Sequence, residues 1–308
     1  MTWRVFTGGL TALAMWLSAA GPAAAQPVTY TWAATSASLW GTPANWNPAT
    51  STTGPGSQSD PTNTDTAVFS SVGTSTSIQL NFGTIGTPRY LGTIVQDPTD
   101  TVARTVGSNS ATAGVLILNG TGANNLVIDN QSAAAMTFAP QAGGGTGPMT
   151  VQLVQSNSTI SAANGSSTTL TGVVTISAGV GEGATPSGIT KVGPGVLVLS
   201  GANSFTGPTT VSNGFVDYVA PVSLYNNTPT SWTATNLVVR PGAAMVFRVL
   251  ATPTTTTGFA ATDFDNLKAL GSATGGFMNG SAIGIDTGTV GTNLTYAGNI
   301  GNTNGGAN

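Results

Sequence analysis

The chain has 308 residues and a formal charge of −3, and only 6% of its residues are charged. An ordinary globular domain has about 25% charged residues, so solubility must come here from Thr, Ser, Asn and Gln, which suit a stacked β surface. The chain has no cysteine and no histidine, which excludes disulfides, metal sites built on Cys or His, and a Ser-His-Asp triad; the acidic balance argues against nucleic-acid binding.

Residues 1–25 are typical of a secretory signal peptide. Arg4 supplies the positive charge, an uncharged and mostly apolar stretch follows, and the run Ala23-Ala24-Ala25 fits a small-residue cleavage site. A membrane anchor is the alternative, but Thr and Gly interrupt the stretch, and a spanning helix needs about 20 apolar residues. We expect cleavage after Ala25, so that the mature chain begins at Gln26.

Residues 26–77 form a tryptophan-rich opening module that contains Trp32, Trp40 and Trp46. Two interpretations of these side chains stand side by side. Exposed tryptophans would provide a platform for a carbohydrate, whereas buried ones would cover the hydrophobic end of a repeat structure. Because large aromatic side chains are usually buried, the sequence favours the cover.

Short apolar runs separated by Gly, Asn, Thr and Pro fill residues 78–260 and predict strands rather than helices. Such a pattern fits an antiparallel sandwich or barrel, or a parallel β-helix. Internal similarity favours the β-helix: the stretch GVLILNG at 114–120 is echoed by GVLVLSG at 195–201, and a turn and a second strand follow each. Alternation within the second stretch predicts that Leu197 and Leu199 point into the core.

Residues 261–308 begin with a stretch whose apolar spacing predicts a short helix within 261–270, and they end in a flexible tail rich in Gly and Asn. Asp263 and Asp265 could form a calcium or glycosidase site, but the preferred interpretation is a helix cap and its neighbour. The tail carries no aromatic residue after Tyr296, so we expect an uncovered end of the β-helix that self-associates.

The remaining charged residues predict no catalytic, cofactor-binding or metal site, and no cofactor is expected. Asp97 and Asp100 read as a turn. Four other charged residues could meet on one face, as in polysaccharide lyases, although one Glu and nine Asp are too few for a dense acidic groove. These four are Lys191, Asp217, Arg240 and Arg248.

The stretch from Lys191 to Val216 closely resembles the autotransporter-associated β-strand repeat. Its one marked departure is Pro208, where the family usually has a second glycine; a turn tolerates proline. The matching positions are Lys191, Gly193, Gly195, Leu197, Leu199, Ser200, Gly201, Asn203, Phe205, Gly207, Thr209, Val211 and Gly214. The opening module is also similar to the module that precedes such repeats, and residues 264–296 more weakly resemble the segment that leads into a further one.

The resemblance implies an all-β, single-stranded, right-handed parallel β-helix with an N-terminal cap, of the kind found in autotransporter passengers. It implies a secreted or bacterial cell-surface protein, which would be associated with the outer membrane if a β-barrel translocator follows. Such a barrel or further repeats would lie outside this chain. We therefore expect a truncated reading frame. The expected function is structural or adhesin-like without catalysis, and the alternative is a carbohydrate-binding module or a polysaccharide-active enzyme. Candidate partners are a surface polysaccharide or the surface of a host or neighbouring cell.

Overall fold

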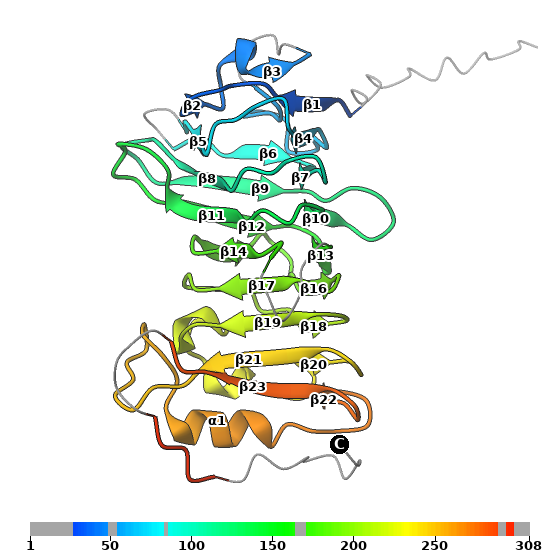
Figure 1. Cartoon of the computed structure of the whole chain (residues 1–308), viewed down its shortest axis with the longest axis vertical. Coiled ribbons are helices and arrows are strands. Elements are labelled where there is room, and N and C mark those ends of the chain that lie inside the picture. The colour runs from blue at the N-terminus through cyan, green and yellow to red at the C-terminus, as the bar shows by residue number, and fades with distance from the viewer. Residues whose placement is uncertain (1–26, 49–53, 83–85, 164–170, 289–293, 299–308) are drawn as a thin grey trace, which may run out of the picture.

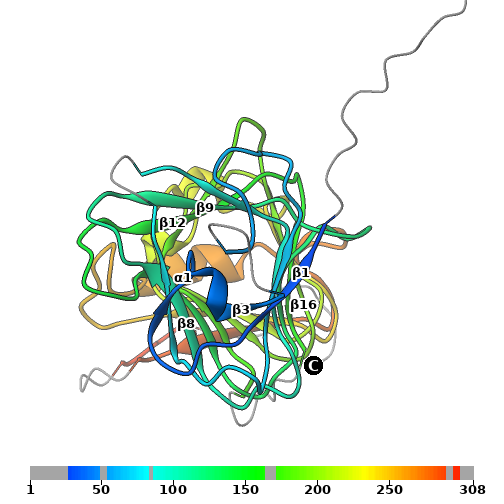
Figure 2. The same cartoon turned by 90° about the horizontal axis from the view of Figure 1, so that it is seen from above.

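The computed structural model describes residues 27–48, 54–82, 86–163, 171–288 and 294–298. It is a parallel β-helix in which successive coils stack along one axis (Figure 1), and the view along that axis shows the coils superimposed as a ring (Figure 2). The predicted cleavage site at Ala25 lies outside the described residues. The prediction of a β-helix is confirmed.

Three sheets run along the stack, and neighbouring strands in each are parallel except β1 and β3. Sheet A contains, in spatial order, β22 (Gly276–Phe277), β20 (Leu237–Val239), β18 (Thr209–Val211), β16 (Ile189–Val192), β13 (Ser158–Ala162), β10 (Leu126–Asn130), β7 (Thr93–Gln96), β4 (Thr66–Phe69), β1 (Thr29–Trp32) and β3 (Trp46–Asn47). Sheet B contains β2 (Ser38–Leu39), β5 (Ser77–Leu80), β8 (Arg104–Ser108), β11 (Met136–Gln141), β14 (Val174–Ile176), β17 (Val196–Leu199), β19 (Phe215–Tyr218), β21 (Ala244–Arg248) and β23 (Ala282–Asp286). The shorter sheet C contains β15 (Gly179–Glu182), β12 (Met149–Leu153), β9 (Gly114–Leu118) and β6 (Arg89–Leu91). The helical elements are α1 (Ala261–Lys268) and the 3-10 turns η1 (Pro43–Asn45), η2 (Pro221–Ser223) and η3 (Pro229–Ser231).

Each strand contributes alternate side chains to a continuous core, because side chains along a strand point to opposite faces. In sheet B the register aligns one inward side chain from each coil into a single file. The file is Ile78, Val106, Phe138, Ile176, Leu199, Tyr218, Phe247 and Ile285. A few apolar side chains per coil are therefore enough, since stacking makes the core continuous.

The length of a coil varies along the stack. In sheet A the coil that runs from Ile189 to its aligned partner Thr209 is short, whereas the coil from Val238 to Gly276 is far longer. The coils differ in length because the connections between their strands differ in length. The stacked strands also extend from Thr29 to Asp286, beyond the expected repeat region of 78–260.

We predict that Leu199→Ala lowers the free energy of unfolding by about 2–5 kcal/mol, since it removes a buried side chain and leaves a cavity. Leu199 and Leu197 are both fully buried. Urea denaturation measures the change, and the matched control is Val198→Ala, because Val198 lies on the same strand with a half-buried side chain. Equal losses in the two variants would contradict the inward orientation of Leu199.

The N-terminal end of the stack is closed by aromatic side chains. Trp32, Trp40 and Trp46 are at most 2% exposed, and their rings meet edge to face at centroid distances of 4.8 and 4.7 Å. The indole of Trp40 donates to Pro55 O at 2.9 Å, and that of Trp46 donates to Trp40 O at 2.8 Å. Buried rings cannot serve as a carbohydrate platform, so these tryptophans cover the core.

The C-terminal end of the stack is covered as well, which corrects the expectation of an open end. Helix α1 lies across it in both views (Figures 1 and 2), within the stretch for which the sequence predicts a helix. Phe264 and Leu267 project from α1 into the core, and the Phe264 ring lies 6.4 Å from that of Phe247 and 5.3 Å from that of Tyr296. The cover is supplied by α1, which precedes the Gly- and Asn-rich tail in the chain.

Candidate functional site

The coil that carries the repeat motif runs through β16, β17 and β18 and is the shortest in sheet A. Its strand positions Leu197, Leu199 and Val211 are fully buried. Phe205 is also buried and meets the ring of Tyr225 edge to face at 5.4 Å, while Thr209 accepts a hydrogen bond from Tyr218 Oη at 3.1 Å. The apolar motif positions therefore build the core of this coil.

Lys191 is the one charged residue among the inward positions of the motif. The register aligns it with Ile160 on one side and Val211 on the other, so an ammonium occupies an aliphatic position in sheet A. The side chain is fully buried, and Nζ donates to Val192 O and Gly193 O at 2.8 Å and to Asn213 O at 3.3 Å. Burial lowers the pKa of Lys191 to about 7, because desolvation disfavours the charged form.

Glycines of the motif allow the turns of neighbouring coils to approach closely. A Cβ on Gly201 would lie 2.2 Å from Ala178 O, and Gly214 has φ +65° and would place a Cβ 2.3 Å from Gly195 O. Side chains at these positions would push adjacent coils apart. Of the other motif residues, Gly193 and Gly195 lie in the turn before β17, Ser200 directly follows β17, and Gly207 packs against Ser187.

Asn203 links three successive layers of the stack. Its Oδ1 accepts a hydrogen bond from Val180 N at 2.9 Å in the preceding coil, and its Nδ2 donates to Ser223 O at 2.7 Å in the following one. The side chain is fully buried. Sheet C ends at β15, and Asn203 carries the hydrogen bonding onward where regular strand pairing stops. The motif coil is thus a structural joint, and its residues hold the stack together.

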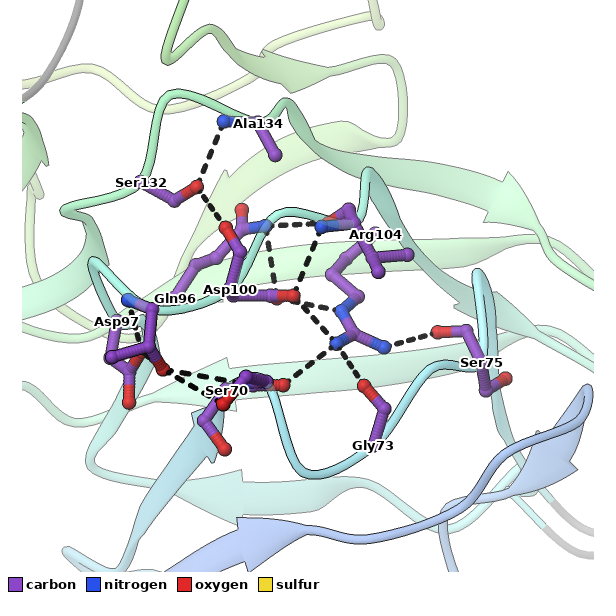
Figure 3. Close-up of polar contacts among 12 residues, drawn as sticks. Ser70, Gly73, Ser75, Gln96, Asp97, Asp100, Arg104, Ser132 and Ala134 are labelled. Carbon is purple, nitrogen blue, oxygen red and sulfur yellow. Dashed lines mark hydrogen bonds and ion pairs between the residues drawn. The ribbon is translucent and has the colours of Figure 1, made fainter.

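Sequence reasoning missed a buried polar network, which lies between β7 and β8 (Figure 3). Arg104 and Asp100 are each 1% exposed and pair in a bidentate manner, with Nε to Oδ2 and Nη2 to Oδ1 both at 2.7 Å. The guanidinium also donates to Ser70 O at 3.0 Å and to the carbonyls of Gly73 and Ser75 in the preceding coil. Asp97 forms the expected turn, but Asp100 is a buried ion-pair partner.

The same network reaches the next coil. The hydroxyl of Ser132 donates to Asp100 O, and Gln96 Nε2 donates to Asp100 Oδ2 at 3.1 Å and to Val102 O at 2.8 Å. Three successive coils are therefore tied at one corner by a single ion pair. These four side chains are at most 1% exposed, so the network is enclosed by the fold and has a structural role. We refer to Arg104, Asp100, Gln96 and Ser132 as the corner clasp.

Of the four charged residues considered for a shared face, the structure brings together only Asp217 and Arg248. Both lie on sheet B, where Arg248 Nε pairs with Asp286 Oδ2 at 2.7 Å. Lys191 is buried in sheet A, and Arg240 follows β20 of that sheet and is exposed. Burial, with a smaller contribution from the charge of Asp286, raises the pKa of Asp217 to about 6.

We predict that Asp217→Asn raises the free energy of unfolding at pH 7 by about 1–3 kcal/mol. Because the pKa of Asp217 in the folded chain is raised above its ordinary value, its stabilising contribution is complete below pH 4 and is lost as the pH rises through 6. Denaturation at pH 4 and pH 7 checks this, since the free energies of unfolding of the wild-type protein and Asp217→Asn should converge at the lower pH. A difference that is independent of pH would contradict it.

The carboxylates of α1 have structural roles. Asp263 Oδ2 accepts a hydrogen bond from Ala260 N at 3.0 Å, as expected of an acidic residue at a helix N-terminus. Asp265 pairs with Lys268 Nζ at 2.6 Å and accepts a hydrogen bond from Tyr296 Oη. Within the described ranges no group of three His, Cys, Asp or Glu side chains could hold a metal ion.

Comparison with known families agrees with this geometry. Residues 189–216, from the start of β16 into β19, match the model of the passenger-associated-transport-repeat family. The chain carries an autotransporter-associated repeat. The repeat indicates a passenger-type domain and thereby a secreted or cell-surface protein. Comparison with curated proteins and with solved structures finds no match. In the part of the chain that the structure describes, no helix is long and apolar enough to cross a membrane.

Proposed function

We propose that the chain is an exported, non-catalytic β-helix that serves as a structural or adhesin-like element at the bacterial surface. The observation that carries the proposal is the use of its charged side chains. Arg104 pairs with Asp100 in the corner clasp, Lys191 binds three backbone carbonyls, and Arg248 pairs with Asp286. Charges that are bound within the fold are poorly suited to act on a substrate, and a surface of uncharged polar side chains suits adhesion.

The expected partner is a surface polysaccharide or the surface of a host or neighbouring cell. Support comes from the passenger-type repeat and from the long outer faces of sheets A and B, which offer rows of half-exposed Thr and Val side chains. Extended faces of this kind are the usual binding surfaces of solenoid proteins.

A second candidate, a polysaccharide-active enzyme, rests on Asp217 and Asp286. One carboxyl has a raised pKa and the other pairs with Arg248, and a difference in environment between two carboxyl groups is typical of acid–base pairs. A pocket lined by Arg248 and several threonines lies beside them. Against this candidate, one oxygen of Asp217 is buried without a hydrogen-bond partner, so it is turned away from solvent.

Expression of the full chain in a bacterial host tests both candidates. We expect the protein in the secreted or surface fraction, with a mass that corresponds to a mature chain beginning at Gln26. Particles coated with the protein should be retained on bacterial cells. The protein should release no sugars from neutral or acidic polysaccharides. Intact Met1 on a cytoplasmic product would contradict export. Turnover that is lost in both Asp217→Asn and Asp286→Asn would favour the enzyme.

A further inference from the structure

We propose that a groove on the outer face of sheet A binds a neutral saccharide. The groove has a volume of about 480 Å³ and extends across β10, β13 and β16, three neighbouring strands of the sheet. Its size falls within the range of about 300–1,000 Å³ that is usual for ligand sites. The inference rests on the proposed function, since it gives a place and a ligand class for the polysaccharide contact expected there.

One wall of the groove is formed by the loop that connects β9 to β10. The coil that runs from Ile94 to its aligned partner Ile128 is much longer than the coil from Ile189 to Thr209, the shortest in sheet A. The connection from β9 to β10, residues 119–125, projects beside the sheet (Figure 1). Loops that project from a solenoid commonly carry its binding function.

This wall is held in place before any ligand binds. Asn125 adopts φ +50°, its carbonyl accepts a hydrogen bond from Thr159 N at 2.9 Å, and its side-chain amide donates to Asn157 O at 3.2 Å. Thr159 Oγ1 donates to Asn124 O at 2.5 Å, and Thr190 Oγ1 donates to Asn157 Oδ1 at 2.6 Å. Because the loop and the sheet are already ordered, binding costs little further conformational entropy.

The polar groups of the groove match a polyhydroxylated ligand. Asp129 and Ser161 are aligned neighbours on the floor, and Asp129 is 8% exposed. One oxygen of Asp129 accepts a hydrogen bond from Gln131 Nε2 at 2.6 Å, and the other carboxylate oxygen can accept from sugar hydroxyls. The amide of Asn157 donates and the hydroxyl of Ser161 both donates and accepts. Leu126 and Val192 add apolar surface for the C–H faces of a sugar ring.

The same residues argue against other ligands. The groove is lined by no Lys or Arg, so an anion would meet the carboxylate of Asp129 without a compensating charge. A single carboxylate is too little for calcium, which takes six to eight oxygen ligands. The lining also lacks an aromatic ring or a deep apolar pocket, which peptide partners usually need as an anchor.

The test is NMR titration of the ¹⁵N-labelled mature chain with maltotetraose, cellotetraose, mannotetraose, galactotetraose and chitotetraose. We expect at least one of these to shift the side-chain amide resonances of Asn124, Asn125 and Asn157. Trigalacturonate and a neutral Gly-Ser peptide serve as the charged and peptide probes, and neither should shift them. If none of the five neutral oligosaccharides shifts these resonances at millimolar concentration, or if only the charged or peptide probe does, the proposal is wrong.

Variants locate the site. Ser161→Trp fills the groove and should abolish the shifts, whereas Thr175→Trp, at an outward and half-exposed position on β14 of the same coil, should leave them unchanged. Asp129→Asn keeps the shape of the floor and should weaken binding by at least about tenfold, because it removes a charged acceptor. Circular dichroism confirms that each variant is folded. Binding that survives both Ser161→Trp and Asp129→Asn would overturn the assignment, even if the surface function holds.

Discussion

Asp100→Asn is expected to lower the free energy of unfolding by about 3–5 kcal/mol, the cost of leaving a buried charge without its partner. The guanidinium of Arg104 would keep its backbone acceptors, but it would lose the negative charge of its partner and one of the two acceptor oxygens at 2.7 Å. Since the corner clasp joins three coils, the loss is not confined to one turn. Chemical denaturation followed by circular dichroism measures it.

Two further variants distinguish the contribution of the Asp100–Arg104 ion pair to stability from the general effects of a substitution. Asp97→Asn changes the neighbouring turn, where the side chain is half-buried and accepts from Thr99 N at 2.8 Å, and it should cost less than about 1 kcal/mol. The double variant Asp100→Asn, Arg104→Met should be less destabilised than the sum of the single variants, because no unpaired charge remains. Strict additivity would show that the pair is not coupled.

Lys191→Met is expected to remove a pH dependence of stability that the wild-type chain shows between pH 7 and 10. Burial lowers the pKa of Lys191 to about 7, so in this window the unfolded chain binds more protons than the folded one. The wild-type free energy of unfolding should therefore rise with pH, by up to about 4 kcal/mol across the window. Urea denaturation at intervals of one pH unit measures the slope.

The chain's other lysine provides the control. Hydrogen bonding to Asp265 raises the pKa of Lys268, the opposite direction, so Lys268→Met should leave the slope below pH 10 intact. At pH 7 the change in the free energy of unfolding caused by Lys191→Met has two opposing contributions. Methionine packs better beside Ile160 and Val211, but three backbone carbonyls lose their hydrogen-bond donor. Parallel pH profiles for the wild-type protein and Lys191→Met would contradict a buried, readily deprotonated lysine.

The fold could be predicted from the sequence because it depends on local patterns. Alternation around Leu197 and Leu199 reveals the inward face, and the spacing of glycines in the repeat motif reveals the turns. The burial of Trp32, Trp40 and Trp46 also follows from the general preference of large aromatic rings. Each of these features depends on residues that are close together in the sequence and not on distant contacts.

Long-range contacts could not be predicted in the same way. Asp100 sits in a turn-like stretch, and only the stacking of coils places the carbonyls of Ser70 and Gly73 around its partner Arg104. The groove on sheet A likewise depends on how the β9–β10 connection folds back over Thr159. The cover formed by α1 was missed because the prediction considered the last residues of the chain rather than the helix before them.

The corner clasp has a mechanical consequence for a protein built of stacked coils. A pull along the axis would detach a solenoid one coil at a time from an end, since each coil contacts only its neighbours. Arg104 binds the carbonyl of Ser70 in the preceding coil, and Ser132 of the following coil binds the carbonyl of Asp100. These three coils must therefore detach together. Tensile resistance is thus concentrated toward the N-terminal part of the stack, and peeling should begin at the α1 end.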